Sequence, residues 1–85
     1  MDKITLEFIL WADAHSEDAW AAADDVELRI HLVHTYGQVI REDDNLVMVA
    51  LNYVPADGGV SCVMIIPKCC IKKRYEIEGY GRSTI

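Results

Sequence analysis

The sequence contains no long apolar run and no signal-like opening. Its most hydrophobic N-terminal stretch, ITLEFILWADA, is interrupted by Glu7 and falls short of the ~18 apolar residues that a membrane span requires. No basic region precedes a purely apolar one. We therefore expect a cytoplasmic protein that does not insert into a membrane.

Positive charge is also scarce. The chain has 14 acidic residues against 8 Lys and Arg, a net charge of −6. Residues 1–44 hold eleven of the acids and three of the bases, whereas residues 45–85 hold three acids and five bases. Because affinity for a phosphate backbone comes largely from Lys and Arg, this balance argues against direct binding of DNA or RNA.

Cysteine is too sparse and too oddly placed for a disulfide framework or a metal site. There are three cysteines, two of them adjacent at Cys69 and Cys70. Consecutive Cα atoms lie only about 3.8 Å apart, which is shorter than most disulfides allow. Their spacing from Cys62 matches no zinc pattern, although the three histidines of the chain are possible further ligands. We expect free thiols, no bound metal and no cofactor. The histidines are His15, His31 and His34.

No catalytic motif is legible. Ser61 and His34 can be combined on paper with one of many carboxylates, but no strand–turn–helix elbow presents a nucleophile. The acidic clusters at residues 24–27 and 42–44 lack the spacing of a calcium loop, and we interpret them as solvated turns. The sequence predicts that the protein is not an enzyme.

What the chain does have is enough apolar material for one small domain. Hydrophobic residues make up 52% of its 85 residues, which favours a globular fold. In residues 4–11, Ile4, Leu6, Phe8 and Leu10 alternate with polar positions such as Glu7. This period of two predicts a first strand with those four side chains on its buried face.

Further strands are expected at residues 32–42, 46–54, 60–66 and 72–78, with Gly37 marking a bend in the second. Ser16 is a suitable N-cap for a short helix over residues 17–24 that carries Trp20. Pro67 ends the fourth strand and leaves room for one tight helical turn. We expect a single domain over residues 1–78 and a flexible tail at 79–85.

This order of elements resembles an SH3-like barrel. The resemblance covers residues 4–78, and its most specific part is IIPKCCI, where such barrels place a short 3₁₀ turn before the closing strand. It implies a mainly β fold: a five-stranded small barrel with a short helix in the long first loop. The pattern ILWADA…W…VHTYGQVIREDDNLVMVALNYV…GGV…MIIPKCCIK is also similar to small proteins encoded by tailed bacteriophages.

That second resemblance implies a viral accessory role in the cytoplasm of a bacterial host. We expect a non-enzymatic protein that binds a host component. One alternative is an inhibitor of bacterial immunity that captures an anionic nucleotide signal of the cyclic-nucleotide or ADP-ribose type. Another is a structural or assembly component of the virion.

Aromatic and basic side chains are the candidate ligand-binding residues. In SH3-like barrels the groove beside the first loop often presents aromatic rings, on which nucleobases can stack. Basic side chains near the last strand can grip an anion, or they can simply protect a sheet edge from unwanted pairing. Core packing is the competing interpretation for both tryptophans. The candidates are Trp11, Trp20, Tyr36, Tyr53, Lys68, Lys72 and Arg74.

Two of the expected strands, LVMVALNYV and VSCVMII, are apolar on both faces. A small barrel buries only one face, so the other requires the helix or a second subunit. We expect a homo-oligomer, most simply a dimer, whose interface includes Met48, Met64 and Ile66. Lys72 or Arg74 would then lie near acidic residues 17–27 of the other copy.

Overall fold

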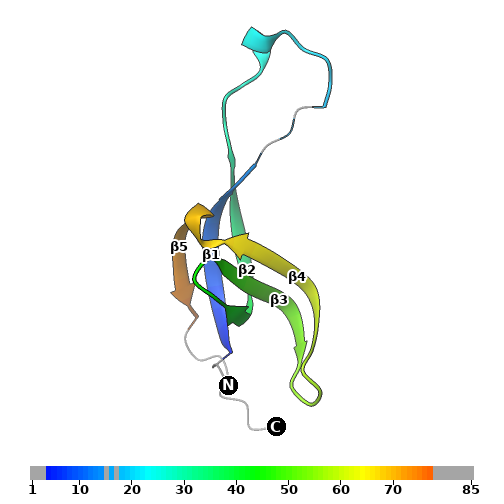
Figure 1. Ribbon diagram of the computed structural model, residues 1–85, viewed down its shortest axis with the longest axis vertical. Helices are drawn as coiled ribbons and strands as arrows, with labels where there is room; N and C mark the ends of the chain where they lie inside the picture. Colours follow the sequence, from blue (N-terminus) through cyan, green and yellow to red (C-terminus); the bar gives the residue numbers. More distant parts are fainter. Residues whose placement is uncertain (1–3, 15, 17, 78–85) are drawn as a thin grey trace.

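The computed structural model describes residues 4–14, 16 and 18–77. Five antiparallel strands form one sheet in the order β4-β3-β2-β1-β5 (Figure 1). The strands are β1 (Thr5–Asp13), β2 (His31–Glu42), β3 (Leu46–Val54), β4 (Gly59–Pro67) and β5 (Ile71–Glu76). The prediction of a mainly β fold with five strands is confirmed, and each strand lies close to its expected range.

Short turns join the last four strands. Asp43 Oδ1 accepts hydrogen bonds from the backbone N–H groups of Asn45 and Leu46, both at 2.8 Å, and so forms the turn between β2 and β3. Gly58 has φ of 77° in the turn between β3 and β4, a conformation that favours glycine. The 3₁₀ turn η2 (Lys68–Cys70) precedes β5 as predicted.

The sheet curls around a small core. Ile9, Val39, Val47 and Ile66 are buried in one cluster with Trp11 and Val49. Ile9 lies on β1 and Ile66 on β4, which are separated in the sheet by two strands. In a flat sheet these strands would be about 14 Å apart, at about 4.8 Å per strand. Their contact with a common core therefore requires the sheet to bend, and β3 and β4 cross in front of β1 and β2 (Figure 1).

The curled sheet is not closed into a barrel. Among the described residues β5 pairs with β1 and β4 pairs with β3, but β4 and β5 do not pair with each other. Both are edge strands. The link from β5 to the end of β2 is made by side chains, since Arg74 bonds Glu42. The predicted closed barrel is therefore wrong in this respect, because the edge strands β4 and β5 do not pair with each other in the part of the chain that the structure describes.

The helix predicted over residues 17–24 is also wrong. Within the described residues this segment holds only the 3₁₀ turn η1 (Ala23–Asp25). A helix this short is marginal in water without a surface to pack on, and Trp20 finds none: it is 104% exposed. Residues 18–30, here called the arm, instead project beyond the end of the sheet (Figure 1). Trp20 therefore does not pin a helix to the sheet.

The buried face of β1 is opposite to the one predicted. Glu7, Ile9 and Trp11 point into the core, whereas Phe8 and Leu10 lie on the outer face and are only half-buried. Both sets of alternating positions contain apolar residues, so the period of two alone does not identify the inner face. Glu7 can lie on the inner face because its carboxylate is paired with the partly buried Arg74.

The strand register also revises the predicted interface. Val47 faces Ile66 and Val49 faces Met64, while Met48 faces Ile65. Directly opposed residues share a face, so Met48 lies on the opposite face from Met64 and Ile66. Ile66 is fully buried within the chain. The three residues therefore do not form one interface. The tail predicted at residues 79–85 lies outside the described residues.

Candidate functional site

The candidate Trp11 is a core residue. It is 7% exposed, and its indole Nε1 donates a hydrogen bond to Thr35 Oγ1 at 2.9 Å. Because both its ring and its polar atom are already engaged within the protein, Trp11 does not offer a ligand surface. Core packing, the competing interpretation from sequence, is correct for this tryptophan.

Two of the predicted anion-binding residues are engaged by carboxylates of the chain itself. Arg74 grips Glu7 with two hydrogen bonds, Nε to Oε1 at 2.7 Å and Nη2 to Oε2 at 2.9 Å. Arg74 Nη2 also donates to Glu42 Oε2 at 2.8 Å. Lys68 Nζ lies 2.9 Å from Glu42 Oε1. We call these four residues the ion network.

The ion network balances its own charge. Arg74 and then Lys68, by hydrogen bonding, lower the pKa of Glu42 from 4.5 to about 2. Glu7 and then Glu42 raise the pKa of Arg74. With two carboxylates facing two cations, Lys68 and Arg74 are not free to hold an external anion. They bind β5 and η2 to β1 and to the end of β2.

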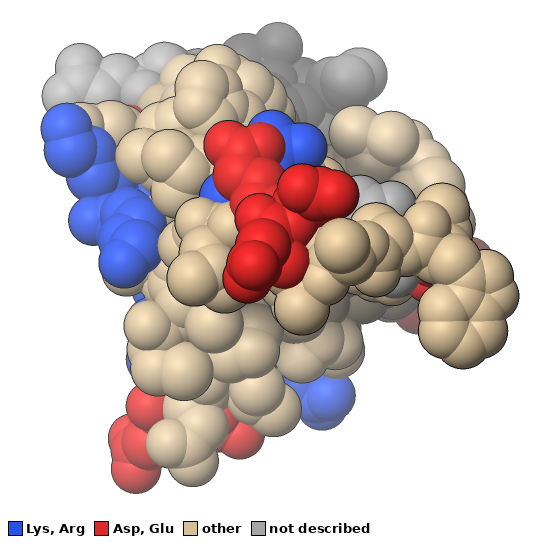
Figure 2. Space-filling view, turned by 90° about the horizontal axis from the view of Figure 1, so that it is seen from above, with Lys and Arg blue, Asp and Glu red and all other residues tan. Residues whose placement is uncertain are grey.

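Lys72 stays exposed on β5, as does its neighbour Lys73. Seen from the end that carries the arm, basic side chains gather along one side of the molecule and acidic side chains over its middle (Figure 2). Lys72 and Lys73 on an edge strand fit the interpretation as a charged edge that discourages pairing. They are also cations open to an external anion.

An aromatic row lies on the outer face of β5, β1 and β2. Phe8 is directly opposite Tyr36 on one side and Tyr75 on the other. The ring centroids of Phe8 and Tyr36 are 5.0 Å apart, and those of Phe8 and Tyr75 are 5.9 Å apart with planes only 13° from parallel. His34 meets the edge of the Phe8 ring at 5.3 Å. Three neighbouring strands thus present contacting rings.

The aromatic row is open to solvent. Tyr36 is 60% and Tyr75 54% exposed, and Phe8 is half-buried between them. Of the seven candidates from sequence, Tyr36 is the one that this row contains. Phe8, His34 and Tyr75 were missed, since Phe8 was assigned to the core. The signal that could have found them is the cross-strand register, which sequence periodicity does not supply.

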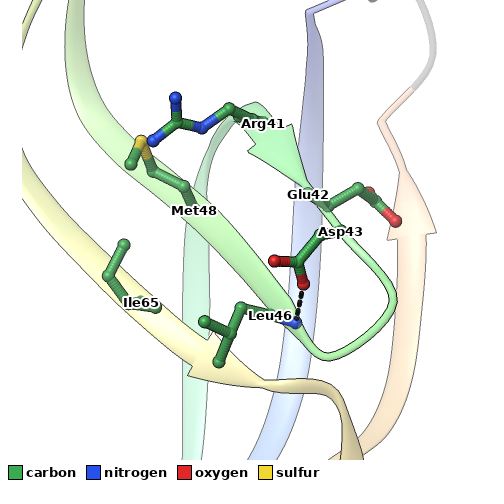
Figure 3. A pocket seen from close by; sticks show the side chains of 6 residues that line it. All are labelled: Arg41, Glu42, Asp43, Leu46, Met48 and Ile65. Carbon is green, nitrogen blue, oxygen red and sulfur yellow. Dashed lines mark hydrogen bonds between the residues drawn. The ribbon is translucent and has the colours of Figure 1, made fainter.

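Two hollows lie beside the last residues of β2 and the first residues of β3, since Arg41 and Met48 line both. One is lined by Arg41, Glu42, Asp43, Leu46, Met48 and Ile65. Figure 3 shows these side chains with the hydrogen bond from the Leu46 N–H to Asp43 that shapes the adjoining turn. The second, here called the groove, has a volume of about 510 Å³. It is lined by Ile4, Ile40, Arg41, Met48, Tyr53, Gly58 and Val60. The candidate Tyr53 therefore belongs to the groove and not to the aromatic row.

Neither the cysteines nor the hypothetical triad of Ser61, His34 and a carboxylate forms an assembled site in the described part of the chain. Cys69 Sγ and Cys70 Sγ are 3.9 Å apart and share a hydrogen bond without forming a disulfide, and this hydrogen bond raises the pKa of Cys70. Ser61 Oγ accepts a hydrogen bond from Asn52 Nδ2 at 2.9 Å, while His34 packs on Phe8. Within residues 4–14, 16 and 18–77, no group of three or more His, Cys, Asp or Glu side chains is placed to hold a metal. The same part of the chain has no helix long and apolar enough to cross a membrane.

No protein-family model matches the chain, and no curated protein or solved structure matches it.

Proposed function

We propose that the protein is a non-enzymatic binding module with SH3-like connectivity, and that the aromatic row is its ligand surface. The strand order β4-β3-β2-β1-β5 and the 3₁₀ turn before β5 support the connectivity. The observation that carries the binding role is the run of exposed, contacting rings of Tyr36, Phe8 and Tyr75 across three strands.

Such a row suits a binding surface for physical reasons. Tyrosine combines a large apolar ring with a polar hydroxyl, and aromatic residues are enriched at protein interfaces. The row sits on paired strands, so its rings are held in place before the ligand arrives. We propose that the ligand is a protein component of a bacterial host, which is what the resemblance of the sequence pattern to phage proteins implies.

A differential capture experiment tests this role. Immobilised wild-type protein and a Tyr36→Ala/Tyr75→Ala variant are exposed to the same bacterial lysate, and retained proteins are compared by mass spectrometry. Both tyrosines are more than half exposed, so the fold should survive, which circular dichroism checks. We expect a partner retained by the wild type and depleted at least tenfold with the variant.

Leu51→Ala is the matched control, because Leu51 is 63% exposed and lies outside the aromatic row. It should retain the partner as well as the wild type does. If the double tyrosine variant retains every protein that the wild type retains, the aromatic row is not the ligand surface. Enzymatic turnover of a nucleotide or ester panel by the purified protein would contradict the non-enzymatic class.

Capture of a small anionic nucleotide is a second candidate. The rings favour it, because bases stack on aromatic side chains for about 1 to 3 kcal/mol each, and Lys73 is placed opposite Leu10 beside the row. Lys68 and Arg74 are already paired with Glu42 and Glu7, which argues against their binding a nucleotide. A thermal shift screen decides: a nucleotide at 100 times its Kd adds about 2.7 kcal/mol to stability, and the absence of any shift removes this candidate.

A further inference from the structure

The arm holds large apolar side chains in water. Trp20 is 104% and Leu28 100% exposed, and Val26 and Ile30 are exposed as well. Apolar surface of this extent, gathered on one projecting segment, typically marks an interaction site. Acidic residues lie beside it: Asp24 and Asp25 form part of η1, and Glu27 follows, paired with Arg29 at 3.6 Å. The arm is therefore an apolar and acidic element that lacks a surface to cover it within its own described chain.

The groove has the complementary character. Its lining is mainly apolar, and Arg41 is the charged residue in it. It is continuous with the hollow shown in Figure 3, because Arg41 and Met48 line both. That hollow also holds Asp43 and Glu42, of which Glu42 is engaged by Arg74 and Lys68. Leu46 and Ile65, each more than 40% exposed, extend the apolar surface there. An indole ring and a leucine side chain fit a space of about 510 Å³.

The arm and the groove of one chain lie at opposite ends of the molecule. The arm leaves the sheet where Asp13 pairs with His31, whereas the groove includes Ile4, next to the Thr5–Val39 pair at the other end of β1. The nine residues of β1 separate the two by about 26 Å at about 3.3 Å per step along the strand. The hairpin of β3 and β4, which supplies Tyr53, Gly58 and Val60 to the groove, lies at the end of the molecule opposite to the arm (Figure 1). The arm therefore cannot fill the groove of its own chain without refolding.

We propose that the occupant of the groove is the arm of a second copy of this chain, inserted through Trp20 and Leu28. When two copies lie side by side in opposite directions, each arm meets the groove of the other. This exchange is two-fold symmetric and closes on itself, which gives a dimer and not an open filament. Arg41 faces the acidic residues of the arm, so charge favours the same pairing.

This interface is separate from the proposed ligand surface. The aromatic row lies on the outer face of β5, β1 and β2, and none of its rings lines the groove. A substitution that abolishes dimerisation should therefore leave partner capture intact, and the reverse should also hold. The interface also replaces the set expected from sequence: it retains Met48 but not the buried Ile66.

Sedimentation and fluorescence test the exchange together. The chain has two tryptophans, and Trp11 is already buried. As the protein concentration rises through the micromolar range, we expect the mass to change from 9.6 kDa to twice that value. The tryptophan emission should shift to shorter wavelength as Trp20 enters the groove. A Trp20→Phe variant, which retains only Trp11, should show no such shift.

Trp20→Ala/Leu28→Ala should weaken dimerisation by about 100-fold or more, since each substitution removes a large buried side chain from both halves of a symmetric interface. Both residues are fully exposed in the single chain, so its fold is unaffected. Tyr36→Ala/Tyr75→Ala should dimerise like the wild type. A wild type that stays monomeric at 100 µM, or a dimer that persists unchanged in the arm variant, overturns the proposal.

A charge exchange tests the pairing of arm and groove. Arg41→Glu should weaken the dimer about tenfold, and adding Asp24→Arg and Asp25→Arg should recover most of that loss. Recovery by the combined variant requires that the two sites meet across the interface. If the combined variant is as weak as Arg41→Glu alone, Arg41 does not face the arm, and the groove is not its docking site.

Discussion

Gly37 is the position in β2 where the sheet leaves no room for a side chain. A Cβ atom built there would lie 2.6 Å from Val49 Cγ1 and 3.0 Å from the carbonyl oxygen of Ala50. The next two residues of β2 are the ones that pair with both β1 and β3. Gly37 therefore permits the close approach of β3 at Val49 and Ala50.

We predict that Gly37→Ala destabilises the protein by about 1 to 3 kcal/mol, the usual cost of overpacking a filled interior. The Ala50 oxygen belongs to the backbone and cannot move aside as a side chain can. Chemical denaturation followed by circular dichroism measures the change. Gly59→Ala is the control, because the atom nearest to its new Cβ is Oδ1 of the exposed Asp57. Equal losses in the two variants would contradict this explanation.

Glu7 shows what sequence periodicity predicts and what it does not. The alternation in residues 4–11 correctly predicts a strand, but a carboxylate at Glu7 favours assigning that face to solvent. In the structure Glu7 is 8% exposed because Arg74, far along the chain, supplies two hydrogen bonds. A partner 67 residues away has no local signature. The inner face of β1, and with it the aromatic row, could not be predicted without the register.

At the scale of elements, the ion network joins strands through side chains in addition to the backbone pairing of the sheet. It ties β5 and η2 to β1 and to the end of β2 through Glu42, Arg74 and Lys68. The pKa of Glu42 is about 2 in the folded protein, against 4.5 as its ordinary value. A carboxyl with a lowered pKa binds fewer protons when folded than when unfolded.

It follows that the stability contributed by Glu42 is complete above about pH 4.5 and is lost as the pH falls toward 2. We predict that Glu42→Gln is less stable than the wild type at pH 6, and that the difference narrows steadily between pH 5 and pH 2. Denaturation at a series of pH values measures it. Lys72→Ala, an exposed change on β5 near Arg74, should keep the pH dependence of the wild type. If the stability difference between Glu42→Gln and the wild type stays constant over this pH range, the ion network is not its cause.

The turns can be predicted from sequence more reliably than the conformation of residues 17–24. The turns follow from local chemistry, as where Asp43 caps the backbone before β3, and they were predicted. The segment at residues 17–24 has alanines and a cap, but helix propensity without a packing surface is too weak to decide the outcome. The arm is the result, with η1 as its one short regular turn among the described residues.

At the scale of the whole molecule, the proposed exchange of arms links stability to concentration. A chain of 85 residues buries only part of its apolar surface by folding alone. The expectation of a second subunit rests on the two apolar faces of β3 and β4, which a sequence can reveal. The register of β3 against β4 decides which of Met48, Met64 and Ile66 share a face. The sequence alone does not reveal this register.

We predict that the melting temperature of the wild type rises with protein concentration, because association stabilises the folded state by mass action. Differential scanning calorimetry between 5 and 500 µM measures this. Trp20→Ala/Leu28→Ala should melt at one temperature across that range. A wild-type melting temperature that is independent of concentration would mean that assembly adds nothing to folding.

The open edge at β4 poses a hazard that one residue reduces. Cys62, in the middle of this strand, has φ of 54°, a left-handed conformation that disfavours side chains with a Cβ. It interrupts the regular row of N–H and C=O groups that an extended apolar edge would otherwise offer to other chains. Edge strands of this kind template fibrils when they are straight. We therefore expect the left-handed residue at Cys62 to make this edge, which is rich in Val and Ile, a poorer template for ordered aggregates.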